Sequence, residues 1–479
     1  MKKTLKLIVA LALVVSMALC MTSCDTIMGI INGLIGEQPE RPVVEVAAQG
    51  VDEENHVIHI GNTAATSGAF APVGVPFNYA QEAYFWYFTT QTEGYKDAEG
   101  NKYTIQFHHY DDEFDGVKGS NYTQKLVEED KVFALVGHFG SNTVGATVDY
   151  IEEQGIPMVY GVCGVSDLYN TEANIMTVQP IYDTEGQSMV ATAFAPAPNG
   201  LGATKLGVIS TTDDAGKGML NGIKIELNRL GKTAEFQAVG AADTDYSAAV
   251  TALKTAGCDV VIIAANQAPF VNIAKTFVTA QYENVKIITS YVSANAATMG
   301  GLAAAGLMTD TREVYAGAWL VTGSLPTPTK GWQDFAEYVR IMTLYAVHNG
   351  DTILPATDVD NLGYLGAYYF GAESWYLEAG GVSAYFLNSY AMAGYVSANV
   401  FCEGLSRMSG KTLTWEGYIA AMETAPVNVP MGTSVSYANG QRVGIDALAV
   451  NKYTAADAAA GGSVYRGITD LKTLEDAIK

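Results

Sequence analysis

Short apolar segments alternate with longer amphipathic ones along most of this chain, and this alternation limits its possible folds more than any other feature. Val57–Gly61, Tyr103–Tyr110 and Val132–Val136 have the length and composition of strands. The segments that follow them have helical spacing, and helices are predicted over Phe77–Gln91, Val117–Glu129 and Thr143–Gln154. Short strands separated by helices are typical of right-handed βαβ crossovers and a parallel sheet.

The same alternation starts again near Lys205. The run Asp259–Ala264 is rich in β-branched residues, as in a buried strand, and further strands are predicted over residues 205–210, 234–239 and 285–290. Crossovers between the two series are expected near Pro180–Thr184 and Val314–Val321, with a closing strand over Gly444–Asn451. The sequence therefore predicts an α/β fold with two doubly wound parallel-sheet lobes, which also suits a chain too long for one core.

The N-terminus has the pattern of a bacterial secretion signal. Lys2, Lys3 and Lys6 precede the apolar stretch Leu7–Leu19, which is too short for a comfortable membrane span. The following Met21-Thr22-Ser23-Cys24 is similar to a lipobox, although Met21 stands where Leu is commoner. We predict a signal peptide over residues 1–23, lipidation of Cys24 and a tether over residues 24–55; an ordinary secretory signal is the alternative.

Charge and cysteine content exclude several classes of protein. The chain has 27 basic and 50 acidic side chains, a net charge of −23, and such a surface repels nucleic acid. Beyond Cys24 only Cys163, Cys258 and Cys402 remain. Because they are few, odd in number and far apart, they form neither a disulfide framework nor a zinc site, and at most one bridge is possible. Nothing after residue 24 has the pattern of a transmembrane helix.

An aromatic-rich segment lies within residues 332–405. Its tyrosines crowd a Gly- and Ala-rich stretch that Glu373 and Glu378 interrupt, which argues against a membrane span. Two interpretations remain open: helices packed together by aromatic rings, or an aromatic wall that lines a ligand cleft.

Two loops of the first series are candidates for ligand binding, because open parallel sheets bind ligands beyond the carboxyl ends of their strands. Asn62–Gly68, which includes Ser67, follows the first strand, and Phe139–Thr143 follows the third. Gly140 would let the backbone approach a ligand, and the Ser141 hydroxyl and the helix N-terminus would suit a carboxylate or another compact anion. Helix capping by the Ser and Asn side chains is the alternative explanation.

Two other patterns resemble functional sites without completing them. Asp111–Gly116 matches the start of a calcium-binding loop, but Tyr122 stands where the bidentate Glu is needed. His108 and His109 are adjacent on a strand, so their side chains point to opposite faces and do not form a metal site. No nucleophile elbow, HExxH motif or P-loop occurs, so we predict no enzyme activity, metal or cofactor.

The ordered series of motifs resembles the leucine/isoleucine/valine-type periplasmic binding proteins from residue 56 to 453, apart from an aromatic-rich insertion at about 340–390. The residues that carry the resemblance are Gly61, Ser67-Gly68, Asp111-Asp112, Lys125–Val127, Leu135–Ser141, Gly155–Pro157, Asp259–Val261, Ala316-Gly317 and Gly394–Leu405. The resemblance implies the type I periplasmic-binding fold, with two lobes joined by a three-strand hinge. It implies lobe 1 over residues 56–182 and 320–425, and lobe 2 over residues 183–319 and 426–479.

The resemblance also implies where a solute would bind. Ser141 matches the Ser that holds a ligand carboxylate; Phe139 and Gly140 flank it. The next positions of the family's site fall on Cys163, Gly164, Ala215, Asn266, Gln267 and Tyr291. A Thr is usual where Cys163-Gly164 stands, and an acid for the ammonium group is usual where Tyr291 stands, unless Asp213 or Asp214 replaces it. An unpaired ammonium in a closed cleft is costly, so a simple branched-chain amino acid fits poorly.

The sequence therefore predicts an extracytoplasmic, lipid-anchored solute-binding protein of an ABC importer. Its expected partners are a small polar solute, such as an amino acid or a related amide or heterocyclic compound, and the permease subunits. The membrane is a further partner through the N-terminal lipid, and the chain is expected to be a monomer. A solute sensor without transport, or an enzyme on the same scaffold, are the alternatives.

Overall fold

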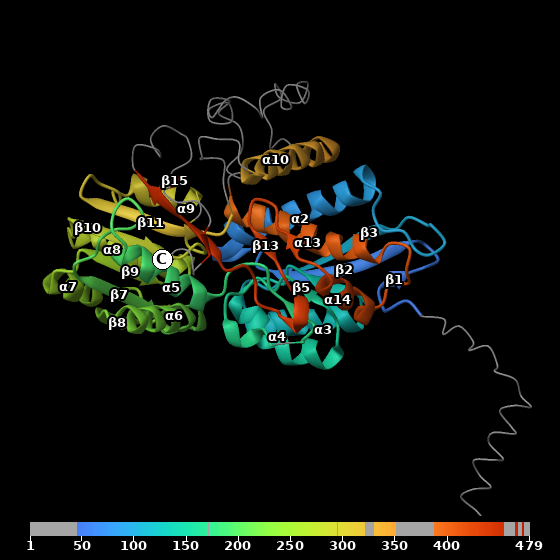
Figure 1. Ribbon diagram of the computed structural model, residues 1–479, viewed down its shortest axis with the longest axis horizontal. Helices are drawn as coiled ribbons and strands as arrows, with labels where there is room; N and C mark the ends of the chain where they lie inside the picture. Colours follow the sequence, from blue (N-terminus) through green and yellow to red (C-terminus); the bar gives the residue numbers. More distant parts are fainter. Residues whose placement is uncertain are drawn as a thin grey trace, which may run out of the picture. The chain divides into compact units, whose positions relative to one another are not determined.

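A computed structural model describes residues 46–170, 172–294, 296–320, 330–350, 388–454, 465–467 and 472–473 (Figure 1). The predicted signal peptide, Cys24 and most of the tether lie outside these residues, as does the part of the aromatic-rich segment over residues 351–387.

Within the described residues the first sheet has six strands, and its parallel core has the order β3-β2-β4-β5-β6. The short strand β1 pairs with the start of β2 in the antiparallel sense. The strands are β1 (Val51–Asp52), β2 (Val57–Ala64), β3 (Thr104–Asp111), β4 (Ala134–Val136), β5 (Met158–Val159) and β6 (Ile175–Met176). The helices between them are η1 (Gly68–Phe70), α2 (Ala71–Gln91), α3 (Gly116–Glu128), α4 (Ser141–Gln154) and η2 (Ser166–Leu168).

In the part of the chain that the structure describes, the second sheet has eight strands, with a parallel core in the order β8-β7-β9-β10-β11 and antiparallel strands beyond β11. Its strands are β7 (Leu206–Thr211), β8 (Ala234–Val239), β9 (Val260–Ala264), β10 (Val285–Thr289), β11 (Arg312–Ala318), β14 (Ala447–Tyr453), β15 (Tyr465–Gly467) and β16 (Lys472–Thr473). Its helices are α5 (Tyr182–Phe194), α6 (Asp214–Leu230), α7 (Ser247–Ala256), α8 (Gln267–Thr279) and α9 (Ala296–Ala304).

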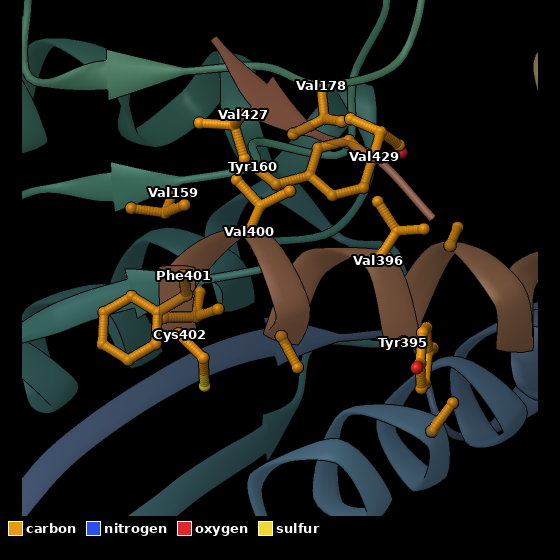
Figure 2. Packing of buried hydrophobic residues seen from close by; sticks show 14 of the residues in the cluster. Val159, Tyr160, Val178, Tyr395, Val396, Val400, Phe401, Cys402, Val427 and Val429 are labelled. Atoms are coloured by element: carbon orange, nitrogen blue, oxygen red, sulfur yellow. The ribbon is translucent and has the colours of Figure 1, made fainter. Parts of the chain in front are cut away.

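The chain then returns to the first sheet before it completes the second. The elements of this return are α10 (Lys330–Asn349), α13 (Ser389–Met408), α14 (Trp415–Glu423), β12 (Val427–Asn428), β13 (Ser434–Val435) and η4 (Ala438–Gly440). Figure 2 shows Val396, Val400 and Phe401 of α13 packed among side chains of the first sheet and of the segment that follows α14. Val427 and Val429, which the sequence interpretation placed in the second lobe, are buried in this same cluster.

Three segments link the two sheets, at the positions expected of a three-strand hinge. The first follows β6, the second follows β11, and the third leads into β14. The first and third run side by side, since Thr177 N donates to Arg442 O at 3.1 Å and Ile445 N donates to Val178 O at 2.9 Å. The α/β fold with two parallel-sheet lobes is therefore confirmed.

The structure adds elements that the sequence pattern did not reveal. Helix α5 starts at Tyr182, inside the expected crossover, and was not predicted because Gly, Ala and Thr interrupt its apolar face. Strand β6 is only two residues long, which is too short for a periodic signal. Helix α2 begins at Ala71 rather than Phe77: Pro72 lies in its first turn, where proline is tolerated, and the helix continues through Pro76.

Candidate solute-binding cavity

A cavity with about 980 Å³ of empty space, open solvent at its mouth included, lies where strand ends of the two sheets meet. Its wall combines residues of both sheets, of the linking segments and of α13. The residues that line it are Phe70, Val73, Phe114, Phe139, Gly140, Ser141, Tyr160, Val162, Gln179, Tyr182, Asn266, Gln267, Tyr291, Val292, Ala294, Gly317, Ala318, Trp319, Leu320, Ser389, Tyr390, Met392, Ala393, Asn451 and Tyr453.

The wall of the cavity is aromatic and uncharged. Its aromatic residues are Phe70, Phe114, Phe139, Tyr160, Tyr182, Tyr291, Trp319, Tyr390 and Tyr453. Among the described residues, none that lines the cavity is Asp, Glu, Lys, Arg or His. Mostly apolar walls with a few placed polar groups are typical of small-molecule sites, and here the polar groups are amides and hydroxyls.

On the side of the first sheet, the N-terminus of α4 borders the cavity. Gly140 has φ +98°, and a Cβ at this position would lie 2.5 Å from the Phe114 ring, so only glycine fits. Ser141 begins the helix, and its Oγ lies 3.5 Å from the hydroxyl of Tyr182. Because Gly140 supplies no capping side chain, the first N–H groups of α4 are suited to an oxygen of a ligand.

The buried carboxyl group of Asp112 lies behind the N-terminus of α4 and connects the elements that form this side of the wall. It accepts hydrogen bonds from Thr63 Oγ1 at 2.9 Å, from Thr143 Oγ1 at 2.7 Å and from Phe114 N at 2.9 Å. One carboxyl group therefore ties β2, the first turn of α4 and the Phe114 loop together. Burial raises the pKa of Asp112, and the three hydrogen bonds partly oppose this shift.

On the side of the second sheet, the cavity meets the start of α8 and the turn after β10. Asn266 is the N-cap of α8, and its side chain makes no capping bond to the helix. The Gln267 amide donates to Thr298 Oγ1, which fixes its orientation. Tyr291 is held at both ends: its N–H donates to Glu185 Oε1 and its hydroxyl donates to Pro180 O, each at 2.7 Å.

The tyrosine hydroxyls of the wall are bonded within the protein. Tyr160 donates to Gln179 Oε1 at 2.7 Å, Tyr453 donates to Ala294 O at 3.2 Å, and Tyr390 donates to Val292 O. Burial raises the pKa of Tyr160 and Tyr390, so both remain neutral at physiological pH. The rings are thereby fixed as flat surfaces, and their oxygens can still accept hydrogen bonds from a solute.

Six of the ten residues proposed for solute binding line this cavity: Phe139, Gly140, Ser141, Asn266, Gln267 and Tyr291. The other four are placed behind the wall or away from it. Ser67 is exposed and bonds to Asp111. Cys163 and Ala215 are buried in core clusters, and Gly164 packs under the Tyr182 ring, which lies 2.6 Å from the position of a Cβ.

This chain has Tyr291 where the family usually has an acid, and neither Asp213 nor Asp214 takes the place of that acid in the cavity. Asp213 caps α6, with Oδ1 accepting from Gly216 N at 3.0 Å. Asp214 is mostly exposed and lies 3.5 Å from Lys217 Nζ. The acid closest in the fold is Glu185, whose carboxyl group lies behind Tyr291 and does not line the cavity.

Sequence reasoning missed most of the aromatic wall. Tyr160 follows β5, Tyr182 begins α5 after the first linking segment, and Trp319 follows β11; no motif marks any of the three. Tyr390 belongs to the aromatic-rich segment and does line the cavity, in agreement with one of the two interpretations of that segment. Most of its other aromatic residues lie outside the described residues.

The side chains of the calcium-like loop and of the adjacent histidines make hydrogen bonds or contacts within the protein. The three aspartates of the calcium-like loop, Asp111, Asp112 and Asp115, accept hydrogen bonds from nearby backbone N–H groups. His108 contacts His59, whereas His109 contacts Asn62 and Thr66, as expected for opposite faces of a strand.

Within the described ranges, no group of three or more His, Cys, Asp or Glu residues is placed to hold a metal ion. Cys163, Cys258 and Cys402 are buried free thiols. None of the described helices is both long and apolar enough to cross a membrane.

Comparisons with known proteins agree with this architecture. A curated relative, an amino acid binding protein of Pseudomonas aeruginosa, is 26% identical over 155 residues, a match that spans 29% of this chain and 36% of that relative's length. A fatty acid ABC transporter substrate-binding protein from Thermomonospora curvata superposes with a TM-score of 0.67 at 17% identity, covering 90% of this chain and 96% of that chain.

Two further structures have similar folds at low identity. A leucine-binding protein from Thermotoga maritima has a TM-score of 0.64 at 15% identity, covering 88% of this chain and 99% of its own. A solute-binding protein of an ABC transporter from Rhodopseudomonas palustris, in complex with p-hydroxybenzoic acid, has a TM-score of 0.65 at 16% identity, covering 87% and 97%.

The family model described as "Periplasmic binding protein" matches residues 57–320, more than half of the chain. This match spans the segments that carried the resemblance in the sequence except Gly394–Leu405, which lies beyond it, and the proteins of this family bind solutes. The chain therefore belongs to the periplasmic binding protein family and has the type I fold.

Proposed function

We propose that this protein is the extracytoplasmic solute-binding component of an ABC importer, anchored through Cys24, and that its solute is a small planar molecule with an aromatic ring. The observation that carries this proposal is the aromatic, uncharged cavity between two sheets that three segments join. Lobe 1 would comprise residues 56–182 and 320–425 together with the segment that carries Val427 and Val429, lobe 2 would comprise residues 183–319 and the strands from β14 onward, and lobe closure would bury the ring.

The cavity suits an oxygen acceptor on the solute better than an ammonium group. The N-terminus of α4 offers N–H groups and the positive end of the helix dipole to a carboxylate or carbonyl oxygen. No acidic side chain lines the cavity among the described residues, so an ammonium group would be buried without a counter-charge, at a cost of several kcal/mol. The p-hydroxybenzoic acid complex of the Rhodopseudomonas palustris protein supports an aromatic solute in this fold.

The decisive experiment is mass spectrometry of the small molecules released when the purified protein is denatured. We expect one aromatic compound in a near-stoichiometric amount. The matched control is Ala318→Trp, which adds a large side chain at a half-exposed position of the cavity wall and should retain no compound. Recovery of an aliphatic amino acid would refute the proposed solute. Uptake of the identified compound should stop when the protein is deleted; unchanged uptake would favour a sensor.

Replacement of Ser141 by alanine should weaken binding of the released compound by about 1 to 3 kcal/mol, because a buried hydrogen bond to the solute is lost. Isothermal titration calorimetry measures this change. Ser247→Ala is the matched control, since Ser247 is also the first residue of a helix but is exposed and away from the cavity. Equal affinities of the wild type and Ser141→Ala would contradict the placement of the solute at α4.

A further inference from the structure

A buried acid stands directly behind the cavity wall. Glu185 lies in the first turn of α5 and is 1% exposed. Its Oε1 accepts from Tyr291 N at 2.7 Å, and its Oε2 accepts from Ser290 Oγ at 2.8 Å. Ser290 Oγ also accepts from Val292 N at 3.2 Å. One carboxyl group therefore organises the whole turn that follows β10.

This turn contributes directly to the cavity. Tyr291 and Val292 line it, and Tyr390 of α13 donates to Val292 O across the opening between the two sheets. The carboxyl group is also close to the wall itself: a Cβ on Gly317, another lining residue, would lie 3.6 Å from Glu185 Oε1. A change in the charge of Glu185 would therefore reach a solute in two ways: through the position of the Tyr291 ring, and by electrostatic interaction across the wall.

No cation faces this carboxyl group among the described side chains that pack against α5. The titratable groups that interact with it are the neutral hydroxyls of Tyr182, Tyr291 and Tyr390. The charged side chains of the adjoining elements have other partners or are exposed. Lys286 of β10 donates to Leu201 O, Glu313 of β11 pairs with Lys452 of β14, Asp214 of α6 lies near Lys217, Glu226 of α6 pairs with Arg229, and Lys224 of α6 is exposed.

We propose that Glu185 is a positioning residue of the solute site: its carboxyl group holds the Ser290–Val292 turn, and its negative charge weakens the binding of an anionic solute when it ionises. This inference rests on the proposed function of the cavity, because it concerns the affinity for the same solute. It also separates two kinds of solute. An ionised Glu185 repels a carboxylate on the other side of the cavity wall, whereas a neutral amide carries no net charge and is affected much less.

The geometry accommodates both protonation states. A carboxylate accepts from Tyr291 N and from Ser290 Oγ, whereas a protonated carboxyl group still accepts from Tyr291 N and can turn its hydroxyl toward Ser290 Oγ. Burial raises the pKa of Glu185 to about 8, although the bonds from Tyr291 and Ser290 oppose this shift. The group is therefore largely neutral at pH 7 and ionises within an accessible range above it.

The first test compares benzoate with benzamide, two probes of the same shape that differ in charge. Calorimetric titrations at pH 6 to 9 should show the benzoate Kd of the wild type rising about tenfold between pH 7 and 9, as expected when only the protonated protein binds. The benzamide Kd should rise less. Glu185→Gln keeps an acceptor for Tyr291 N and cannot ionise, so its profiles should be flat.

The control variant is Glu313→Gln, which removes an ion-paired glutamate of the same sheet and should follow the wild-type pH profile. A benzoate profile that is the same in Glu185→Gln and in the wild type would overturn the proposal for Glu185 while leaving the solute site intact. If neither probe binds the wild type, the aromatic solute proposed above fails, and the second test decides the role of Glu185.

The second test needs no ligand. In protein labelled with ¹⁵N-tyrosine, the Tyr291 amide signal, assigned by its absence from Tyr291→Phe, should shift with a midpoint near pH 8. In Glu185→Gln the same signal should not titrate. A Tyr291 signal that stays constant between pH 6 and 9 in the wild type would show that this carboxyl group does not control the turn.

Discussion

Replacement of Gly394 by alanine is expected to destabilise the protein by about 3 kcal/mol and to weaken solute binding, because α13 packs against the backbone of α2 at this position. A Cβ on Gly394 would lie 2.0 Å from Phe77 O and 2.8 Å from Phe77 C. Backbone atoms in two packed helices cannot move aside as a flexible side chain does, so the helices must separate. The start of α13 carries Ser389, Tyr390 and Met392 into the cavity wall, and separation would displace them.

Urea denaturation measures the loss of stability, and titration with the released solute measures the loss of affinity. Gly145→Ala is the matched control: Gly145 is exposed on α4, and a Cβ there meets nothing within 4 Å. This control should be stabilised by up to about 1 kcal/mol, because alanine favours the helix over glycine. A Gly394→Ala variant as stable as its Gly145→Ala counterpart would contradict the close approach of α13 and α2.

The fold was predictable from the sequence because most of its strands and helices are long enough to show their period. The run Asp259–Ala264 is the clearest case: its β-branched residues are buried in the middle of the second sheet as β9. The missed elements have physical reasons. In α5, Gly186 approaches the backbone of α6, with a Cβ position 2.2 Å from Met219 O. Such close packing selects small residues, which removes the apolar stripe that marks a helix.

The candidate site was less predictable, because its wall is assembled by contacts that are distant in sequence. The loop before α4 carried a readable signal, since a parallel sheet places its ligand loops at the carboxyl ends of strands. Trp319 and Tyr160 carry none, yet their rings meet edge to face at 6.1 Å beside the cavity. The sequence does not mark Glu185 either, because a glutamate in the first turn of a helix is common. Only its burial behind Tyr291 points to a role in the site.

The protein is expected to be most stable near pH 6.5. Buried histidines reduce the free energy of unfolding below this pH, and the buried Glu185 reduces it above. His138 is fully buried and neutral: its Nδ1 accepts from Thr63 N at 3.3 Å, while its Nε2 lies 2.9 Å from Thr123 Oγ1, which donates to Gly119 O. Burial lowers the pKa of His138 to about 3 and that of His109 to about 4, from an ordinary value of 6.5.

Below pH 6.5, the unfolded chain therefore binds protons that the folded protein excludes. Each histidine then costs up to about 1.4 kcal/mol of unfolding free energy per pH unit, less for the half-buried His109. Glu185 acts in the opposite sense: its pKa is raised to about 8, so stability falls as the pH rises from 4.5 to 8, by up to about 1.4 kcal/mol per unit. The loss of stability above pH 6.5 therefore comes from Glu185. Below pH 6.5, the loss caused by the two histidines is larger than the gain from Glu185.

Urea denaturation at pH 5, 6.5 and 8 tests this balance, with the slope against pH rather than the absolute stability as the measurement. The wild type should lose about 1 kcal/mol between pH 6.5 and 8, because the loss from Glu185 is partly offset by the end of the histidine titration, and Glu185→Gln should lose none. In His138→Asn, whose amide oxygen can still accept from Thr63 N, the acid-side slope should approach zero, because His109 and Glu185 then nearly cancel. A wild-type stability that does not vary between pH 5 and 8 would contradict the neutral, buried states assigned to His138 and Glu185.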